Sequence, residues 1–82
     1  MQKATSPKIL GQALKSARTK KRLTQDQAGK LVGITQAMVS RFECGESNIR
    51  IDTLFRLLSA LELELHVNPR GRQAGQGEGD NW

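Results

Sequence analysis

The stretch from Thr24 to Gly45 constrains the fold more than any other part of the chain. It reads TQDQAGKLVGITQAMVSRFECG and predicts two short helices joined by a tight turn, with Thr24 and Thr35 as their N-caps. Gly33 stands where the chain reverses, and a residue without a Cβ adopts a positive φ there at no steric cost. On the first helix, Gly29 would let the second helix approach closely. The rest of the chain is therefore expected to pack around this helix pair.

The second helix of the pair is expected to have a buried and an outer surface. Val39 and Phe42 would point inward with Val32 of the first helix and seal the pair. The residues left on the outer surface have small, polar or basic side chains: Gln36, Ala37, Ser40 and Arg41. Amide, hydroxyl and guanidinium groups have donors and acceptors that match base edges in a DNA major groove. This surface therefore predicts contact with duplex DNA.

Charge is divided unevenly along the 82 residues, which are enough for one small domain with a single core. Residues 1–41 carry nine Lys or Arg and one acid, Asp26, whereas residues 42–82 carry four basic and seven acidic residues. A basic half suggests a polyanionic partner, and the less basic half suggests a different one. Solvation of helix faces is the alternative explanation for the basic residues, and the helix pair favours nucleic acid.

Two further helices are predicted on either side of the pair. The first runs from about 7 to 21, with Ser6 as N-cap and Pro7 at its first position. Gly45 ends the second helix of the pair in a left-handed conformation. The last helix covers 52–61, with Asp52 as its cap. The apolar residues of these two helices are Ile9, Leu10, Ala13, Leu14 and Ala17 in the first and Leu54, Phe55, Leu57, Leu58 and Leu61 in the last, which should lie deep in the fold.

The pattern changes period in the segment 62–67, where Leu63, Leu65 and Val67 alternate with polar residues. Strict alternation indicates a half-buried strand. A single strand in a helical domain has no partner within the chain, and pairing with a second copy across a two-fold axis would satisfy its free edge. We therefore predict a homodimer joined by this strand. The alternative is that the segment continues the last helix, because Leu and Glu are good helix formers.

Both ends of the chain are predicted to be loose. Residues 1–5 are polar without periodicity, and residues 68–82 contain four glycines and almost no apolar side chain before Trp82. The expected organisation is a flexible segment 1–5, a domain 6–67 for DNA binding and dimerisation, and a disordered tail 68–82. Trp82 has two explanations, a docking or degradation signal and a side chain that folds back onto the domain.

Little in the sequence favours an enzyme or a cofactor site. The only histidine, His66, and the only cysteine, Cys44, have no spacing that joins them to a base or nucleophile set. One cysteine gives no disulfide framework and no cysteine-based metal cluster. We expect a non-enzymatic protein without cofactor or metal. With no membrane-length apolar run, we expect it in the cytoplasm and associated with the nucleoid when bound to DNA.

A family resemblance covers about residues 8–61. It is carried by Leu10-Gly11, Arg18, Thr24-Gln25, Gly33, Ser40-Arg41, Glu43, Gly45, Leu54 and Leu61. This run resembles the lambda-repressor-like, Xre-type helix-turn-helix family, and with a terminal strand and a loose tail ending in Trp it is similar to the HipB-type antitoxins. The resemblance implies a mainly α-helical bundle of about four helices plus one strand. It also implies a small dimeric repressor that binds an inverted-repeat operator and a HipA-type serine/threonine kinase toxin.

The resemblance also assigns roles to single residues. Thr35, Gln36 and Ala37 would face bases, and Ser40 and Arg41 would do so one turn later. Gln25 would contact a phosphate and brace the second helix of the pair. Arg18 and Glu43 would form an internal salt bridge. Apart from the resemblance, operator binding by this helix pair would let Lys15 with Asn48 or Arg50 add phosphate contacts. Ala28 and Gly29 depart from the family pattern, which has larger residues there, and the glycine alone would cost about 1 kcal/mol of helix stability.

Two other members of the DNA-binding class fit the same motif. A phage-type repressor and a restriction-modification controller protein are both small dimers, and neither requires the terminal strand or the tail. The antitoxin interpretation is therefore the favoured one, with a stand-alone repressor or controller without a toxin partner as the alternative.

Overall fold

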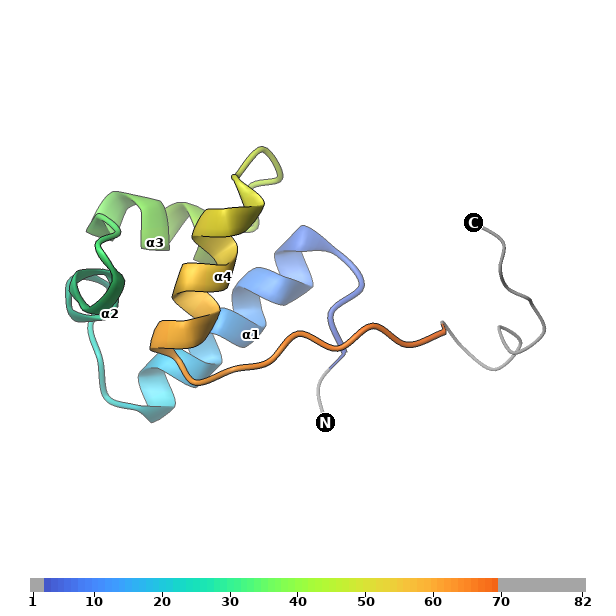
Figure 1. The fold of residues 1–82 in the computed structure, drawn as a ribbon, viewed down its shortest axis with the longest axis horizontal. Coiled ribbons are helices and arrows are strands. Elements are labelled where there is room, and N and C mark those ends of the chain that lie inside the picture. The colour runs from blue at the N-terminus through green and yellow to red at the C-terminus, as the bar shows by residue number, and fades with distance from the viewer. Residues whose placement is uncertain (1–2, 70–82) are drawn as a thin grey trace.

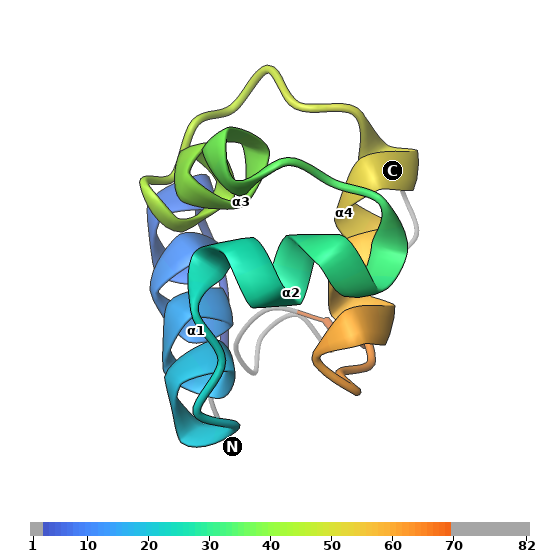
Figure 2. The same cartoon turned by 90° about the vertical axis from the view of Figure 1, so that its left-hand side faces the viewer.

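The computed structural model describes residues 3–69 and contains four helices in that range (Figure 1). They are α1 (Pro7–Lys20), α2 (Gln25–Val32), α3 (Gln36–Glu43) and α4 (Ile51–Ala60). Seen end-on, α2 crosses between α1 and α4, and α3 lies on the other side of the tight turn from α2 (Figure 2). The predicted four-helix, mainly α-helical class is confirmed.

Local sequence explains where the first three helices begin. The Ser6 side chain accepts a hydrogen bond from the Ile9 N–H at 3.1 Å, and Thr35 accepts one from Met38 at the same distance. Thr24 forms a capping box with Gln27, in which each side chain bonds the other residue's backbone N–H. The expected N-caps are therefore present.

The core draws on every helix and on the turn between α2 and α3. Leu14 of α1, Val39 of α3 and Leu57 of α4 are at most 1% exposed. The remaining buried apolar residues are Ala28, Ile34, Phe42, Leu58 and Leu61. A single core of this kind holds α3 from behind and leaves its opposite side in solvent.

Two glycines within helices, Gly11 and Gly29, allow backbones to approach where any Cβ would collide. A Cβ at Gly11 of α1 would lie 2.5 Å from the Phe42 carbonyl oxygen and 2.7 Å from that of Glu43 in α3. A Cβ at Gly29 would collide with the Ile34 carbonyl oxygen. Gly29 therefore admits the turn rather than the body of the second helix, which corrects the expectation from the sequence. Close contact between α1 and α3 depends instead on Gly11.

The start of α4 differs from the prediction. The helix begins at Ile51 with Arg50 as N-cap, and no side chain caps it. Asp52 is not the cap: it lies in the first turn, where Arg50 donates to its two carboxylate oxygens at 3.1 and 3.0 Å. Phe55 was expected to be buried but is 50% exposed, because α4 packs on the core through the side that carries Leu57 and Leu58.

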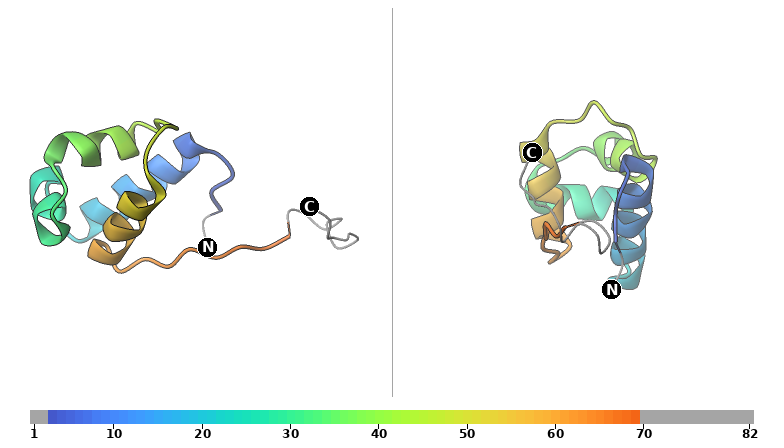
Figure 3. Two further views of the ribbon diagram at one scale, coloured as in Figure 1. Left: turned by 45° about the horizontal axis from the view of Figure 1, so that its top comes forward. Right: turned by 90° about the vertical axis from the view of Figure 1, so that its right-hand side faces the viewer.

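After α4 the chain leaves the helices as an extended segment (Figures 1 and 3). Glu62 has a φ of 57°, so the segment does not continue α4 and that alternative is wrong. Leu63 packs partly against the core, whereas Leu65 is 47% and Val67 88% exposed. The structure assigns no strand within residues 3–69, and a strand paired with a second copy stays a prediction. Most of the predicted tail, Trp82 included, lies outside the described residues.

Candidate nucleic-acid interface

The outer surface of α3 carries the side chains that the sequence predicted to face bases. Thr35, Gln36 and Ala37 are exposed, and Ser40 and Arg41 are partly exposed. Val39 and Phe42 alternate with them and are buried. The core therefore fixes which side of α3 is presented. Thr35 also caps the helix, so its hydroxyl oxygen already accepts one backbone hydrogen bond.

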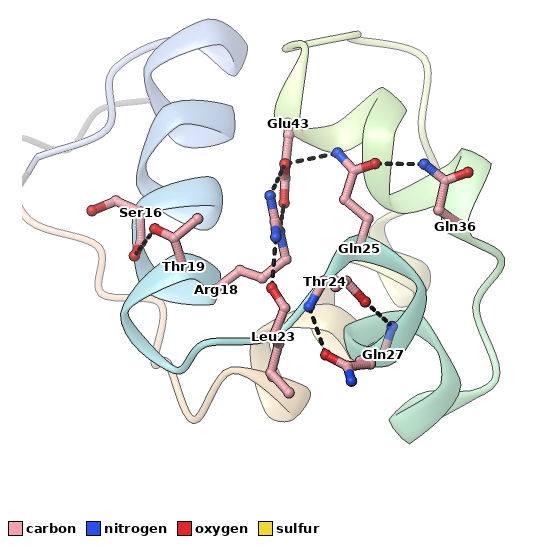
Figure 4. Close-up of polar contacts among 9 residues, drawn as sticks. All are labelled: Ser16, Arg18, Thr19, Leu23, Thr24, Gln25, Gln27, Gln36 and Glu43. Atoms are coloured by element: carbon pink, nitrogen blue, oxygen red, sulfur yellow. Dashed lines mark hydrogen bonds and ion pairs between the residues drawn. The ribbon is translucent and has the colours of Figure 1, made fainter.

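The first residues of α2 and α3 are joined through their side chains (Figure 4). Gln36 donates through Nε2 to Oε1 of Gln25 at 2.5 Å, and Gln25 donates through its own Nε2 to Oε1 of Glu43 at 3.0 Å. The predicted phosphate-contacting residue and the predicted base reader thus touch each other. An exposed amide held in this way loses less conformational entropy on binding.

Behind Gln25 lies the ion pair of Arg18 and Glu43. Nε and Nη2 of Arg18 donate to the two oxygens of Glu43 at 2.6 and 3.1 Å, and Nη1 donates to the Leu23 carbonyl at 2.6 Å. The side chains are 11% and 4% exposed. A hydrogen bond from Arg18 to Glu43 raises the pKa of Arg18, which stays charged. This pair connects α1 to the end of α3.

Burial and charge act in opposite directions on the carboxyl group of Glu43. Burial alone would raise its pKa, but hydrogen bonds from Arg18 and Gln25, together with the charges of Arg18 and Lys15, lower the pKa below its usual value. Glu43 is therefore ionised at neutral pH. Lys15, whose charge contributes to this lowering, is an exposed residue of α1.

Arg41 does not extend freely from α3. Its Nε donates to Glu46 at 2.7 Å, and its Nη2 lies 3.4 Å from Oδ1 of Asn48. The chain reverses at Gly45, where φ is 83° and the N–H groups of Gly45 and Glu46 bond the carbonyls of Phe42 and Arg41. This reversal brings Glu46 back to Arg41. The structure thus places two predicted contact residues, Arg41 and Asn48, side by side.

Other predicted site residues lie apart from this cluster. Arg50 follows the loop and is engaged by Asp52, while Leu63, Leu65 and Val67 belong to the extended segment after α4. Sequence reasoning missed Glu46 and the packing role of Gly11. A signal existed for Glu46, because an acid one residue beyond a helix-ending glycine returns toward the last turn of that helix.

Two kinds of site are not found in the part of the chain that the structure describes. Residues 3–69 contain no group of three or more His, Cys, Asp or Glu side chains that could hold a metal ion. In the same range, no helix has the length and apolar character needed to cross a membrane.

The geometry agrees with what comparisons with known proteins find. Residues 14–67 match the family model described as "Helix-turn-helix". "Antitoxin HipB" of Escherichia coli (strain K12) is 39% identical over 64 residues, which is 78% of this chain and 73% of the relative.

Solved structures give the same result. The structure described as "HipB-O4 20mer complex" superposes with a TM-score of 0.80 at 36% identity, and "Structure of HipA-HipB-O2-O3 complex" with 0.79 at 36% identity; each match covers 85% of this chain and 99% of the other. The restriction-modification controller protein C.AhdI from Aeromonas hydrophila reaches 0.65 at 31% identity over 71% of this chain and 84% of its own. The chain belongs to the helix-turn-helix family, and within it to the family of the HipB antitoxins.

Proposed function

We propose that this chain is a DNA-binding antitoxin that represses its own operon and neutralises a HipA-type serine/threonine kinase toxin. The observation that carries the proposal is the outward-facing, pre-positioned amide of Gln36 on a helix-turn-helix that is 36% identical to HipB in its complexes. The complex that contains HipA supports the toxin as second partner.

In this proposal α3 enters the major groove of duplex DNA. Gln36 can bond N6 and N7 of adenine, and Arg41 can reach guanine or a phosphate once it leaves Glu46. Thr35, Ala37 and Ser40 lie on the same surface and complete the base-facing set. Backbone N–H groups at the start of α2, next to Gln25, can hold a phosphate. Lys15, Asn48 and Arg50 supply further phosphate contacts.

In this proposal two copies of the chain pair through the extended segment after α4. Two copies paired through Leu63, Leu65 and Val67 would place two α3 helices on one face of the duplex. A two-fold dimer reads an inverted repeat whose half-sites are about 34 Å apart, or a multiple of that distance. Paired edges would also cover the apolar side chains that a single chain leaves in solvent.

The DNA-binding part is tested with duplexes selected by the protein from a random pool. We expect affinity to fall steeply with salt concentration, because bound Lys and Arg release counterions from DNA. The double variant Gln36→Ala, Arg41→Ala should lose sequence preference. The matched control, Gln12→Ala, Lys20→Ala, likewise removes one amide and one positive charge, from exposed positions of α1, and should keep the sequence preference. Unchanged affinity and preference in the first variant would refute this part.

The antitoxin part is tested by purifying the full chain from its host. A kinase-sized subunit that co-purifies, and whose activity the chain suppresses, would support the proposal. Deleting residues 68–82 separates two roles for the tail: lost toxin binding indicates docking, and a longer cellular half-life indicates a degradation signal. A chain that binds operator but no kinase would leave only the repressor function.

A controller protein of a restriction-modification system is the second candidate. The fold similarity to C.AhdI favours it, although with a lower TM-score than the HipB structures. The neighbouring genes separate the two functions. A kinase gene next to this one supports the antitoxin, and a methyltransferase or endonuclease gene supports the controller.

A further inference from the structure

The hydrogen bonds that connect α1 to the outer surface of α3 converge on Glu43, which accepts from Arg18 on one side and from Gln25 on the other, while Gln25 accepts from Gln36 (Figure 4). Arg18 has donors only, and Glu43 as a carboxylate has acceptors only. Oε1 of Glu43 lies 3.0 Å from Nε2 of Gln25. Turning the Gln25 amide around would place two acceptor oxygens against each other. The carboxylate therefore dictates which end of the Gln25 amide faces it.

The orientation of Gln25 in turn dictates that of Gln36. With Nε2 of Gln25 directed at Glu43, its Oε1 faces α3 and accepts from Nε2 of Gln36 at 2.5 Å. Gln36 must then present its nitrogen inward. Its Oε1 and its second N–H have no partner among the described residues and are left for a ligand.

We propose that Glu43 is a positioning residue for base recognition, because it fixes the Gln36 amide in the one orientation that selects adenine over guanine. The inference rests on the proposed function, in which DNA occupies the outer surface of α3. Glu43 itself is buried and touches no base. It acts through Gln25, over two successive hydrogen bonds.

The selection follows from the base edges. Adenine offers the N7 acceptor and the N6 donor in the major groove, which pair with one N–H and the Oε1 of a glutamine. Guanine offers two acceptors, N7 and O6, so a fixed Oε1 would face O6 and repel it. An amide that could turn over would present two N–H donors and accept guanine. Holding Oε1 outward therefore excludes guanine at the base pair that Gln36 reads.

The sharpest test is Glu43→Gln, which changes the shape of the side chain very little. The new amide has one oxygen for two Arg18 donors. With that oxygen placed at Nε, the closest donor at 2.6 Å, the amide nitrogen faces Nη2 of Arg18 and Nε2 of Gln25. Gln25 and Gln36 would both turn over, and Gln36 would present N–H donors to the groove. We expect the wild-type preference for adenine over guanine, about tenfold for a good bidentate pair, to fall at least fivefold.

The measurement is fluorescence anisotropy on duplexes that the wild-type full chain selects from a random pool. Gln36→Ala first identifies the base pair that Gln36 reads, as the position at which discrimination collapses. Adenine and guanine duplexes that differ only there are then compared in wild type and in Glu43→Gln. An adenine preference within twofold of wild type in the folded variant would overturn the inference, and so would a wild type in which Gln36 discriminates at no position.

A second variant covers the case in which Glu43→Gln does not fold. Arg18→Met, Glu43→Leu replaces the buried pair with apolar side chains of similar size, an exchange that is often neutral or stabilising. It keeps the net charge, so low-salt affinity for random duplex should stay within about threefold, while the adenine preference should collapse because neither amide is oriented. If this folded variant kept the preference, or lost low-salt affinity altogether, the inference would be wrong.

The matched control is Lys21→Met, Glu62→Leu, which removes a 2.6 Å ion pair between the C-cap of α1 and the segment after α4, with neither residue in α3. It should leave the adenine preference unchanged, and a collapse there too would overturn the inference. A wild type that selects no duplex at all would instead refute the proposed function. The two failures are therefore distinguishable.

Discussion

Gly29 and Gly33 are four residues apart on the same short helix and turn, yet they are required for different reasons. Gly33 has a φ of 73° with nothing near the place of its absent Cβ, so only its backbone conformation requires glycine. This was predictable, because a reversal between two capped helices needs a positive φ. Gly29 is helical and its constraint is a tertiary contact with the Ile34 carbonyl. Helix propensity, which is all that the sequence offers here, therefore predicts only the loss of helix stability caused by Gly29.

Replacing Gly29 with alanine should destabilise the fold, although helix propensity alone would predict a gain of about 1 kcal/mol. The added Cβ meets a backbone oxygen that cannot move without the turn, so we expect a net loss of about 2 kcal/mol, within the usual range for overpacking. Urea unfolding followed by circular dichroism measures it. The control Lys30→Ala, at the next and exposed position, should change stability by less than about 0.5 kcal/mol. A higher midpoint for Gly29→Ala would contradict the contact.

The pair of Arg18 and Glu43 should make stability depend on pH in the acid range. Folding lowers the pKa of Glu43, so the ionised group stabilises the fold at neutral pH, and this stabilisation is lost as the pH falls through the lowered pKa. Arg18→Met, Glu43→Leu should therefore show a flatter decline of the unfolding free energy below neutral pH. Asp52 and Glu62 also have lowered pKa values, but both are exposed and are unchanged in the variant. Parallel pH profiles would contradict the role of Glu43.

At the scale of elements, the start of a helix was predictable where one nearby side chain caps it. It was less predictable at α4, where two residues compete for the N-cap position. Ser6, Thr24 and Thr35 each bond a backbone N–H three residues later, which needs no other part of the chain. At α4, the sequence predicts Asp52 as the N-cap because aspartate is a good N-cap residue. The helix instead begins at Ile51, and Arg50 binds the Asp52 carboxylate. The hydrogen bond between Arg41 and Glu46 could also not be predicted without the geometry of the turn at Gly45.

That contact at the end of α3 gives a prediction for DNA binding. In the free protein Glu46 accepts from Arg41 at 2.7 Å, and this bond must break before Arg41 reaches a base or phosphate. Glu46→Gln removes a negative charge facing the duplex and weakens the bond. We expect it to tighten binding about threefold to tenfold at low salt, with a smaller gain at high salt because screening reduces the repulsion. Anisotropy titrations across a salt series test this.

The matched control for that prediction is Glu64→Gln, which removes one exposed negative charge from the segment after α4. It should shift affinity by less than twofold. Equal gains in both variants would mean that net charge alone, rather than the release of Arg41, sets the effect.

At the scale of the whole molecule, the segment after α4 leaves apolar side chains in solvent. Alternating apolar residues predicted half-burial, but Leu65 is 47% and Val67 88% exposed. Within residues 3–69, no surface buries these two side chains as the alternating pattern predicts. The helices could therefore be inferred from residues within the chain, whereas the surface that Leu65 and Val67 pack against could not.

If a second copy covers that segment, charges on its apolar positions should separate the dimer without unfolding the helices. Leu65→Lys, Val67→Lys places two ammonium groups where each strand would meet its symmetry mate, so we expect a monomer at micromolar concentration with unchanged helical circular dichroism. Analytical ultracentrifugation measures the mass. Glu64→Lys adds the same net charge at the intervening polar position and should stay dimeric. Because one α3 contacts only half of an inverted repeat, the monomer should also lose most of its operator affinity; a dimer that persists in the double variant would place the subunit contact elsewhere on the molecule.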